Sequence, residues 1–368
     1  MHLRIKKQKI QEVLSKIQNI VEKKSMMAIL NHFLIDVTED AVFILATDLE
    51  TAVKQPLEAE IIETGKACIP ARKFYEIVRE LDENIEIKLS EQWIKIQSGR
   101  SNFRLATLDY SEFPVWPQIG DAIKINLSRD FLLTAIENTI YASGEADARY
   151  VLNGLLLHIK KSSEFSIVGT DGHRLAHFKV MIENINLVEE EKKIILSKKS
   201  LNELKKFLSD TNTVSLYIGR THVMCEIDGV SFLTRMIEGT YPDYESVIPK
   251  NNDKIAIVDK NSLIASLKRV SVLSREKQNA VKTEWDKDLL VLSSSDPEIG
   301  EARDEITIDY SGDPFIIGFN ARYIIEALER ITSDKAKITM SEEDRAIYIT
   351  DAETSSSLYE CVVMPLRL

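Results

Sequence analysis

Apolar residues recur at positions i, i+3, i+4 and i+7 in six separate segments of the chain, a spacing that predicts amphipathic helices. Ile10, Val13, Leu14 and Ile17 give one example. Between these segments lie runs such as residues 85–89, in which apolar and polar residues alternate as they do in half-buried strands. The predicted helices cover residues 6–24, 71–83, 128–142, 197–210, 260–277 and 320–331.

The same order of elements occurs three times along the chain. Each copy has one helix, then strands that reach a turn in which Thr or Ser precedes Asp, then a second helix and further strands. The turns are Thr47-Asp48, Thr170-Asp171 and Ser295-Asp296, which lie 123 and 125 residues apart. Two helices over antiparallel strands in each copy predict an α+β fold built from three repeats. Proline-bearing stretches near residues 120 and 250 then predict three domains, 1–120, 121–250 and 251–368.

Composition is that of an ordinary globular protein with more than one core. The chain has 368 residues, 44% of them hydrophobic and 29% charged. Only 13 are glycine, which argues against glycine-rich nucleotide-binding loops. The longest apolar stretch, residues 41–46, is too short to span a bilayer, and the N-terminus lacks a signal-peptide pattern. Isolated cysteines at Cys68, Cys225 and Cys361 favour buried thiols in a reducing compartment, so we expect a cytoplasmic protein.

Net charge is unevenly distributed between the predicted helices and the remainder of the chain. The whole chain carries −11, yet the six helical segments together carry +8 over 91 residues, which leaves −19 elsewhere. Lysine decorates many solvated helix faces, and for a single helix that is the simpler interpretation. Segregation across equivalent helices instead indicates a positive helical surface that attracts phosphates on an acidic protein.

The segment from Thr170 to Leu175 gathers Asp171, His173 and Arg174 in one turn. These groups could serve acid–base or phosphoryl-transfer chemistry, so one hypothesis is a hydrolase or phosphotransferase. A second is an aspartate that caps a strand end, and a third is a binding pocket.

Other signals of chemistry are missing from the sequence. His173 and His177 have helical spacing but follow a strand, and no third ligand is recognisable, so we expect no metal and no cofactor. The chain has no Gly-x-Ser-x-Gly, His-Glu-x-x-His or Gly-x-x-x-x-Gly-Lys-Ser/Thr motif. The turns at Asp48 and Asp296 lack histidine, which would limit any catalysis to the middle copy.

Several motifs lie in order along the three copies. They are Pro70-Ala-Arg-Lys-Phe74, Ser98-Gly-Arg-Ser101, Gly169-Thr-Asp-Gly-His-Arg-Leu-Ala176, Tyr241-Pro-Asp-Tyr244, Ile317-Gly-Phe-Asn320 and Val362-Val-Met-Pro-Leu-Arg-Leu368. In these motifs, over its whole length, the chain resembles the bacterial sliding clamp family, the β subunit of DNA polymerase III. The resemblance implies a non-catalytic processivity factor: a head-to-tail dimer that closes a ring on duplex DNA, with helices inside and sheets outside.

Simple geometry favours two chains in such a ring. Six helices spaced about 9 Å apart form a circle roughly 17 Å across, and a helix width of about 10 Å leaves no room for DNA. Twelve helices leave an opening of about 24 Å, enough for a duplex roughly 20 Å wide.

The positive helices and the resemblance together predict sequence-independent contacts with DNA phosphates, which would let the ring slide. The candidate lining residues are Lys7, Lys16, Lys24, Lys198, Lys199, Lys205, Lys206, Lys268 and Arg269. The resemblance adds Arg149 and Tyr150 in a nearby loop, where Val151 replaces the second aromatic residue of many relatives.

The resemblance also implies a pocket that takes a short Gln-Leu-type motif from polymerases and the clamp loader. By position its residues are Leu152, Thr170, Gly172, His173, Arg174, Leu175, Pro242, Val247, Asn320, Tyr323, Val362, Met364, Pro365 and Arg367. The chain departs from some relatives at Ser246, where a basic residue can stand, and at Leu366, which replaces methionine.

For the dimer, the resemblance places apolar residues of the first copy against apolar residues of the third copy in the partner chain, with opposite charges flanking them. The residues are Phe103 and Leu105 with Lys73 and Arg100 on one side, and Val272 and Leu273 with Glu298, Glu301 and Asp304 on the other. A peptide-binding adaptor that does not bind DNA is a further alternative.

Overall fold

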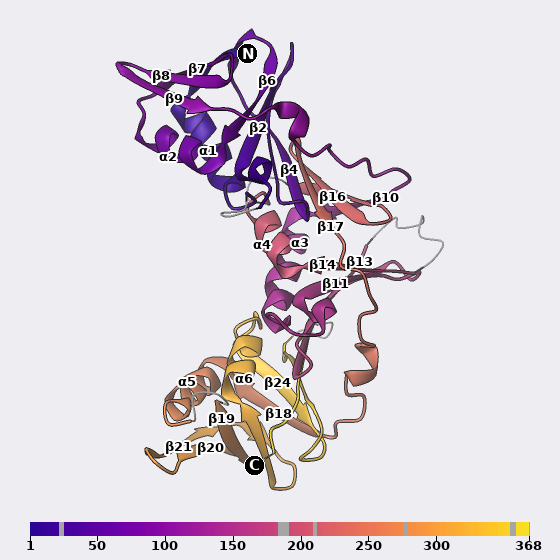
Figure 1. Cartoon of the computed structure of the whole chain (residues 1–368). Coiled ribbons are helices and arrows are strands. Elements are labelled where there is room, and N and C mark those ends of the chain that lie inside the picture. The colour runs from indigo at the N-terminus through magenta and orange to yellow at the C-terminus, as the bar shows by residue number, and fades with distance from the viewer. Residues whose placement is uncertain (22–25, 183–190, 209–211, 275–278, 354–357, 368) are drawn as a thin grey trace. The chain divides into compact units, whose positions relative to one another are not determined.

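The computed structural model of the chain describes residues 1–21, 26–182, 191–208, 212–274, 279–353 and 358–367. The chain divides into two compact units (Figure 1). Unit 1 contains Met1–Leu133 and Lys199–Met236, and unit 2 contains Thr134–Lys198 and Ile237–Leu368. The middle copy of the repeat therefore contributes strands to both units.

Unit 1 contains two antiparallel sheets. The five-stranded sheet has the order β5 (Glu60–Glu63), β1 (His2–Lys6), β7 (Asn84–Ser90), β8 (Trp93–Ser98) and β9 (Ser101–Ala106). The eight-stranded sheet has the order β10 (Ile123–Ser128), β15 (Thr213–Ile218), β16 (His222–Ile227), β17 (Val230–Arg235), β4 (Thr51–Pro56), β3 (Val42–Thr47), β2 (His32–Val37) and β6 (Gly65–Pro70). Pairing of β17 with β4 joins the middle copy to the first.

Unit 2 also contains two antiparallel sheets. The nine-stranded sheet has the order β14 (Lys192–Ser197), β11 (Gly154–Ile159), β12 (Glu164–Thr170), β13 (Arg174–Met181), β26 (Tyr359–Val363), β25 (Ile347–Asp351), β24 (Lys335–Met340), β18 (Lys254–Asp259) and β22 (Asp309–Tyr310). The four-stranded sheet has the order β21 (Gly300–Thr307), β20 (Leu289–Asp296), β19 (Ala280–Asp286) and β23 (Phe315–Asn320). Pairing of β13 with β26 joins the middle copy to the third.

The apolar spacing correctly predicts a helix in each of the six segments. Ile10, Val13, Leu14 and Ile17 are all buried, as the spacing requires. The helices are α1 (Lys7–Ile17), α2 (Ala71–Glu80), α3 (Arg129–Thr139), α4 (Lys198–Lys205), α5 (Lys260–Ser271) and α6 (Ala321–Leu328). All six end earlier than predicted, α1 and α5 by the most. Helix α1 packs on α2, and α5 packs on α6 (Figure 1). Short 3-10 turns occupy Ala28–Asn31, Tyr110–Glu112, Ile140–Ala142, Tyr150–Asn153 and Glu245–Val247.

One hydrogen bond between the two helical segments recurs in all three copies. A basic side chain at the first position of the first helix donates to a main-chain carbonyl at the end of the second helix, where carbonyls lack helical partners. The pairs are Lys7 with Leu81 (2.7 Å), Arg129 with Leu208, and Lys260 with Ile331 (2.9 Å). The threefold repeat is therefore confirmed down to individual bonds.

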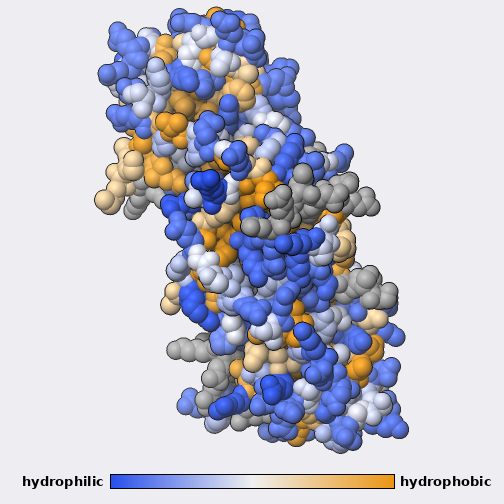
Figure 2. All heavy atoms as spheres, turned by 90° about the vertical axis from the view of Figure 1, so that its right-hand side faces the viewer, coloured by the Kyte–Doolittle hydropathy of each residue, from blue (hydrophilic) through white to orange (hydrophobic). Residues whose placement is uncertain are grey.

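Apolar side chains and thiols fill the interiors of both units. Cys68, Cys225 and Cys361 are free and buried, as their apolar surroundings predict. Burial raises the pKa of Cys68 and Cys225 to about 12. On the face shown in Figure 2 hydrophilic residues predominate and apolar ones form separate groups, as in most folded proteins.

Candidate functional site

The turn between β12 and β13 is held by its own aspartate. Asp171 Oδ1 accepts hydrogen bonds from the main-chain N–H groups of His173 (2.9 Å) and Arg174 (3.1 Å). Gly172 has a φ of +87°, a left-handed conformation that favours glycine, and a Cβ there would lie 2.9 Å from the guanidinium of Arg149. The backbone geometry therefore favours glycine, whereas the guanidinium of the flexible Arg149 side chain could move aside for a Cβ.

Equivalent aspartates hold the turns of the other two copies. Asp48 Oδ1 accepts from the main-chain N–H groups of Glu50 (3.0 Å) and Thr51 (2.6 Å). Asp296 Oδ1 accepts from the N–H of Glu298 (2.9 Å). The interpretation of Asp171 as a cap at a strand end is confirmed, and the same kind of bond occurs at Asp48 and Asp296.

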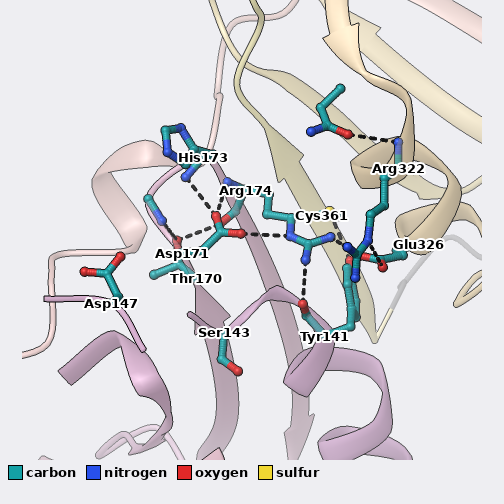
Figure 3. Close-up of polar contacts among 12 residues, drawn as sticks. Tyr141, Ser143, Asp147, Thr170, Asp171, His173, Arg174, Arg322, Glu326 and Cys361 are labelled. Atoms are coloured by element: carbon teal, nitrogen blue, oxygen red, sulfur yellow. Dashed lines mark hydrogen bonds and ion pairs between the residues drawn. The ribbon is translucent and has the colours of Figure 1, made fainter. Parts of the chain in front are cut away.

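Arg174, the first residue of β13, carries a buried guanidinium with partners on several sides (Figure 3). Its Nε donates to Asp171 Oδ2 (3.1 Å), one Nη donates to the carbonyl of Tyr141 (2.6 Å), and the other donates to the Glu326 carboxylate. The ring centroids of Tyr141 and Tyr323 lie 5.0 and 4.4 Å from the guanidinium carbon, within range of cation–π attraction. This single side chain therefore ties the turn of the middle copy to helix α6 of the third.

Both charges of the Arg174–Glu326 pair are stabilised. Burial alone would lower the pKa of Arg174, but the Glu326 carboxylate outweighs burial and raises that pKa above its ordinary value. Burial alone would raise the pKa of Glu326, but hydrogen bonds from Arg174 and from Arg322 Nε (2.7 Å) lower that pKa below 4.5. The pair is therefore fully ionised at neutral pH.

A cavity of about 150 Å³ lies beside this turn, within unit 2. Nine of the fourteen residues expected from the sequence line it: Leu152, Thr170, Gly172, Arg174, Leu175, Pro242, Val247, Val362 and Met364. They come from four separate segments: the pairing of β13 with β26 joins Leu175 to Val362, and Leu152 and Tyr244 pack in the same apolar cluster. Apolar walls with a few polar groups at the edge are typical of a site that takes an apolar anchor from a ligand.

The other five expected residues do not line the cavity. The side chain of Asn320 caps α6 by accepting from the N–H of Arg322 (3.0 Å), and the ring of Tyr323 packs on Arg174. His173 is exposed, and its carbonyl accepts from the N–H of Met364 (2.9 Å). Pro365 is half-buried and Arg367 is exposed near the chain end.

Three lining residues are absent from the expected pocket set. Tyr244 is buried, and its hydroxyl hydrogen-bonds with His158 Nδ1 (2.7 Å). Asp243 is exposed at the edge. Both belong to the motif Tyr241-Pro-Asp-Tyr244, so the sequence contained a signal for them beside the expected Pro242.

The third unexpected lining residue is Arg149, which the resemblance assigns to DNA contact. Its guanidinium donates to Asp147 Oδ2 (2.9 Å) and to the carbonyl of Asp171 (3.0 Å). Hydrogen bonds from Arg149 lower the pKa of Asp147 to about 2. The neighbouring Tyr150, assigned to DNA as well, is exposed.

The hydrolase hypothesis for Asp171, His173 and Arg174 is not supported by their arrangement. The Asp171 carboxylate and the Arg174 guanidinium are engaged in structural bonds, and the His173 imidazole points away from both (Figure 3). Without an aligned base and nucleophile, this turn has no means of general acid–base chemistry.

A second group of residues has the order of a catalytic triad but is sealed inside unit 2. The Ser166 hydroxyl hydrogen-bonds with His177 Nε2 (2.9 Å), and His177 Nδ1 pairs with Glu360 Oε1 (2.6 Å). All three side chains are buried, and Ser166 has no exposed surface. A substrate carbonyl cannot reach this serine, so the chain of bonds is structural.

Two other kinds of site are absent from the described ranges. No group of three or more His, Cys, Asp or Glu side chains there is arranged to hold a metal ion. Within the same ranges, no helix has the length and apolar character needed to cross a membrane.

Positive charge is concentrated on the helices, as the sequence predicts. Within their observed bounds the six helices carry 14 Lys and Arg against 7 Asp and Glu. Several expected DNA contacts are nevertheless engaged within the chain: Lys7 with the carbonyl of Leu81, Lys16 with Glu12, Lys199 with Asp48, Lys206 with Glu203, Lys268 with Glu329 and Arg269 with Asp304. Lys198 and Lys205 are half-buried on α4, and Lys24 lies outside the described residues.

The residues expected at the dimer interface lie on or near two edge strands. Strand β9, with half-buried Leu105 and an exposed Phe103, pairs with β8 and with no other described strand of its sheet. Strand β21 pairs with β20 alone among the described strands. Beside it are Val272, which is 77% exposed, and Leu273, whose Cδ1 approaches Gly300.

Most charged residues expected at this interface are exposed. Arg100, Glu298 and Glu301 are in this class. Lys73 is paired with Glu76 of its own helix (2.8 Å), and the half-buried Asp304 is paired with Arg269 as above. Intrachain pairing therefore competes with the interchain pairs that the sequence suggests.

Comparisons with known proteins agree with this architecture. Models of the DNA polymerase III beta subunit match residues 1–117 (N-terminal domain), 126–243 (central domain) and 245–367 (C-terminal domain). The beta sliding clamps of Pseudomonas putida and Caulobacter vibrioides are 32% and 30% identical over 374 and 376 residues, and each match covers 100% of both chains.

Solved structures give the same result. The Pseudomonas aeruginosa DnaN sliding clamp bound to griselimycin matches with a TM-score of 0.95 at 28% identity over 100% of both chains. The DNA polymerase sliding clamp of Bacillus subtilis matches with a TM-score of 0.94 at 27% identity, covering 100% of this chain and 99% of that one. The chain therefore belongs to the DNA polymerase III β-subunit family, the bacterial sliding clamps, which are processivity factors of DNA replication and not enzymes.

Proposed function

We propose that two copies of this chain close head to tail into a ring on duplex DNA, each with domains 1–120, 121–250 and 251–368. The ring works in the cytoplasm and slides on DNA through its positive helices. The cavity beside Arg174 takes the short motif of the polymerase and of the clamp loader. The observation that carries the ring is that β9 in unit 1 and β21 in unit 2 are edge strands among the described strands and have exposed apolar side chains on or beside them.

Uncovered edges need an explanation because a strand with free N–H and C=O groups is a template for unwanted pairing. Phe103 on β9 and Val272 beside β21 add exposed apolar surface to these edges. A head-to-tail dimer covers β9 and β21 of both chains in two equivalent seams, and the closed ring leaves neither of these two strands free for further head-to-tail growth.

The peptide site is supported by its shape and its walls. Leu152, Leu175 and Val362 are buried side chains that offer an apolar surface, and Met364 is 42% exposed at its edge. The Arg174 pair fixes the turn before any ligand arrives, so a peptide meets a preformed wall and loses less affinity to reorganisation.

Comparing retention of the protein on circular and on linear DNA tests the ring directly. We expect a chain loaded by its clamp loader onto a nicked circular DNA to stay bound through gel filtration and to leave once the circle is cut. A protein that merely binds DNA would respond equally to both forms, and a peptide adaptor would bind neither. Equal retention on circular and linear DNA would exclude a ring.

Substituting Met364→Ala should weaken the binding of a Gln-Leu-x-Leu-Phe peptide about tenfold, since the apolar surface that Met364 buries against the peptide is worth about 1–3 kcal/mol. Fluorescence anisotropy of the labelled peptide gives the dissociation constant. Met181→Ala is the matched control, because Met181 is exposed on β13 of the same unit and away from the cavity lining. Equal affinities in the two variants would argue against this site. Leu368, a second anchor that the sequence suggests, lies outside the described residues.

Charge reversal on α4 should reduce DNA binding without altering the peptide site. Removing one pairing between a lysine and a phosphate flattens the slope of log K against log salt by roughly one. The variant is Lys198→Glu with Lys199→Glu and Lys205→Glu, compared with reversal of three exposed lysines outside the helices, Lys95, Lys161 and Lys287. If both triple variants have the same salt slope, α4 does not face DNA.

A further inference from the structure

The charges that line the cavity do not cancel. Arg149 is neutralised by Asp147 (2.9 Å), and Arg174 is neutralised by Asp171 and Glu326. The remaining charge is Asp243, an exposed carboxylate to which the described part of the chain brings no cation within ion-pair distance. The lining of the site therefore presents an uncompensated negative charge at its edge.

A second acidic segment reaches the same edge from the third copy. Strands β25 and β26 pair Ile347 with Val363, so one step further along this antiparallel ladder Ala346 stands beside Met364, a lining residue. Ala346 also packs against the apolar cluster that contains Leu152, Leu175, Tyr244 and Val362. The residues immediately before Ala346 therefore emerge at the edge of the cavity.

These residues are Glu342, Glu343, Asp344 and Arg345, all of them exposed. Arg345 lies 3.6 Å from Glu342, which leaves Glu343 and Asp344 without a cation within ion-pair distance in the described ranges. Ser246, three residues after Asp243, adds no positive charge, and its hydroxyl donates to the Asp243 carbonyl (2.7 Å). Two acidic segments from different copies thus border one apolar cavity.

The nearby cations do not pair with these acids in the described part of the chain. Lys160 is held between Glu164 (2.7 Å) and Glu245 (2.6 Å). Lys250 and Arg367 are exposed and, like Glu343 and Asp344, lie outside the cavity lining, and neither forms an ion pair within the described ranges. Asp243, Glu343 and Asp344 therefore give the site three carboxylates that no cation of the described chain neutralises by direct pairing.

We propose that this clamp selects docking peptides in which lysine or arginine flanks the apolar anchor, because Asp243, Glu343 and Asp344 attract such flanks and repel acidic ones. The inference rests on the peptide-binding function proposed above and adds a charge requirement to it. Exposed ion pairs are individually weak, so two or three of them give about a three- to tenfold preference. The apolar anchor still supplies most of the affinity.

The test uses three labelled peptides with the same Gln-Leu-x-Leu-Phe anchor and flanks of two Lys, two Gln or two Glu on either side. Dissociation constants are measured by anisotropy with the full-length chain. At about 50 mM salt we expect the Lys-flanked peptide to bind about three- to tenfold more tightly than the Glu-flanked one. At about 500 mM salt the difference should largely vanish, because the Debye length falls to about 4 Å.

Variants in which the acidic side chains are replaced by neutral amides show which residues cause the preference for Lys-flanked peptides. Asp243→Asn combined with Glu343→Gln and Asp344→Asn should bring the three peptides to within about twofold of one another and leave the Gln-flanked affinity unchanged. The matched control is Glu39→Gln with Asp40→Asn, an exposed acidic pair in the turn between β2 and β3, which should keep the full preference.

Each outcome has a distinct meaning. If none of the three peptides binds, the peptide-docking function itself fails. If all three bind with equal affinity, docking stands and the charge requirement is wrong. If the preference survives in the triple variant, or is lost in the control, the acids named here do not cause it.

Discussion

Replacing Glu326 with glutamine is expected to destabilise unit 2 by about 2–4 kcal/mol and to weaken peptide binding. The substitution removes the negative charge that faces the buried Arg174 guanidinium and leaves Asp171 as its carboxylate partner. Loss of one member of a buried pair typically costs about 3–5 kcal/mol, and the partial exposure of Glu326 reduces this figure. Denaturant unfolding followed by tyrosine and tryptophan fluorescence measures the first effect, and peptide anisotropy measures the second.

Arg322→Gln is the matched control for this substitution. Arg322 pairs with the same carboxylate (2.7 Å), but its side chain is exposed, so its loss should cost no more than about 1 kcal/mol. Equal effects of the two variants would show that the buried guanidinium is not the source of the stability.

The contribution of Glu326 to the stability of the folded chain also depends on pH in a defined direction. Its pKa in the folded chain is below 4.5, so its stabilisation is complete above about pH 4.5 and is lost as the pH falls through the lowered value. The difference in stability between the wild-type chain and Glu326→Gln should therefore be constant at neutral pH and should narrow below about pH 4.5. A difference that stays constant down to pH 3 would contradict this assignment.

Periodicity predicted the repeated elements well because burial along one face leaves a mark at fixed spacing. The apolar positions of α1, for example Ile10 and Leu14, are buried as expected. Spacing gives no information about which distant polar groups meet. Glu326 pairs with Arg174 across 152 residues, and Lys199 pairs with Asp48 across 151. Neither pair could be predicted from the sequence around its members.

The same limit explains why five of the expected pocket residues do not line the cavity. Asn320 and Tyr323 lie close to each other in sequence and close to the site in space, yet one caps a helix and the other packs on Arg174. Proximity along the chain predicted their neighbourhood but not the direction of their side chains. Tyr244 was missed for the opposite reason: an aromatic residue in a turn gives no sign that it is buried against His158.

If the ring forms as proposed, the largest effect of a substitution on dimer formation is expected at the seam between the two edge strands. In the free chain Val272 is 77% exposed and Phe103 is 37% exposed, although both are apolar. Charged neighbours contribute little, since Lys73 and Asp304 already have partners in their own chain. Apolar contacts must therefore supply most of the association energy.

Val272→Ala combined with Leu273→Ala should convert the dimer into a folded monomer that still binds the docking peptide. Truncation of one buried Leu costs about 2–5 kcal/mol, and the two equivalent seams of a closed dimer double the effect of each substitution. Peptide binding should survive because the cavity is formed within one chain. Light scattering after size-exclusion chromatography at micromolar concentration gives the mass, and the matched control is Ile255→Ala with Ile316→Ala, two exposed apolar residues of the same unit. A variant that stays wholly dimeric, or that loses peptide binding through unfolding, would place the interface elsewhere.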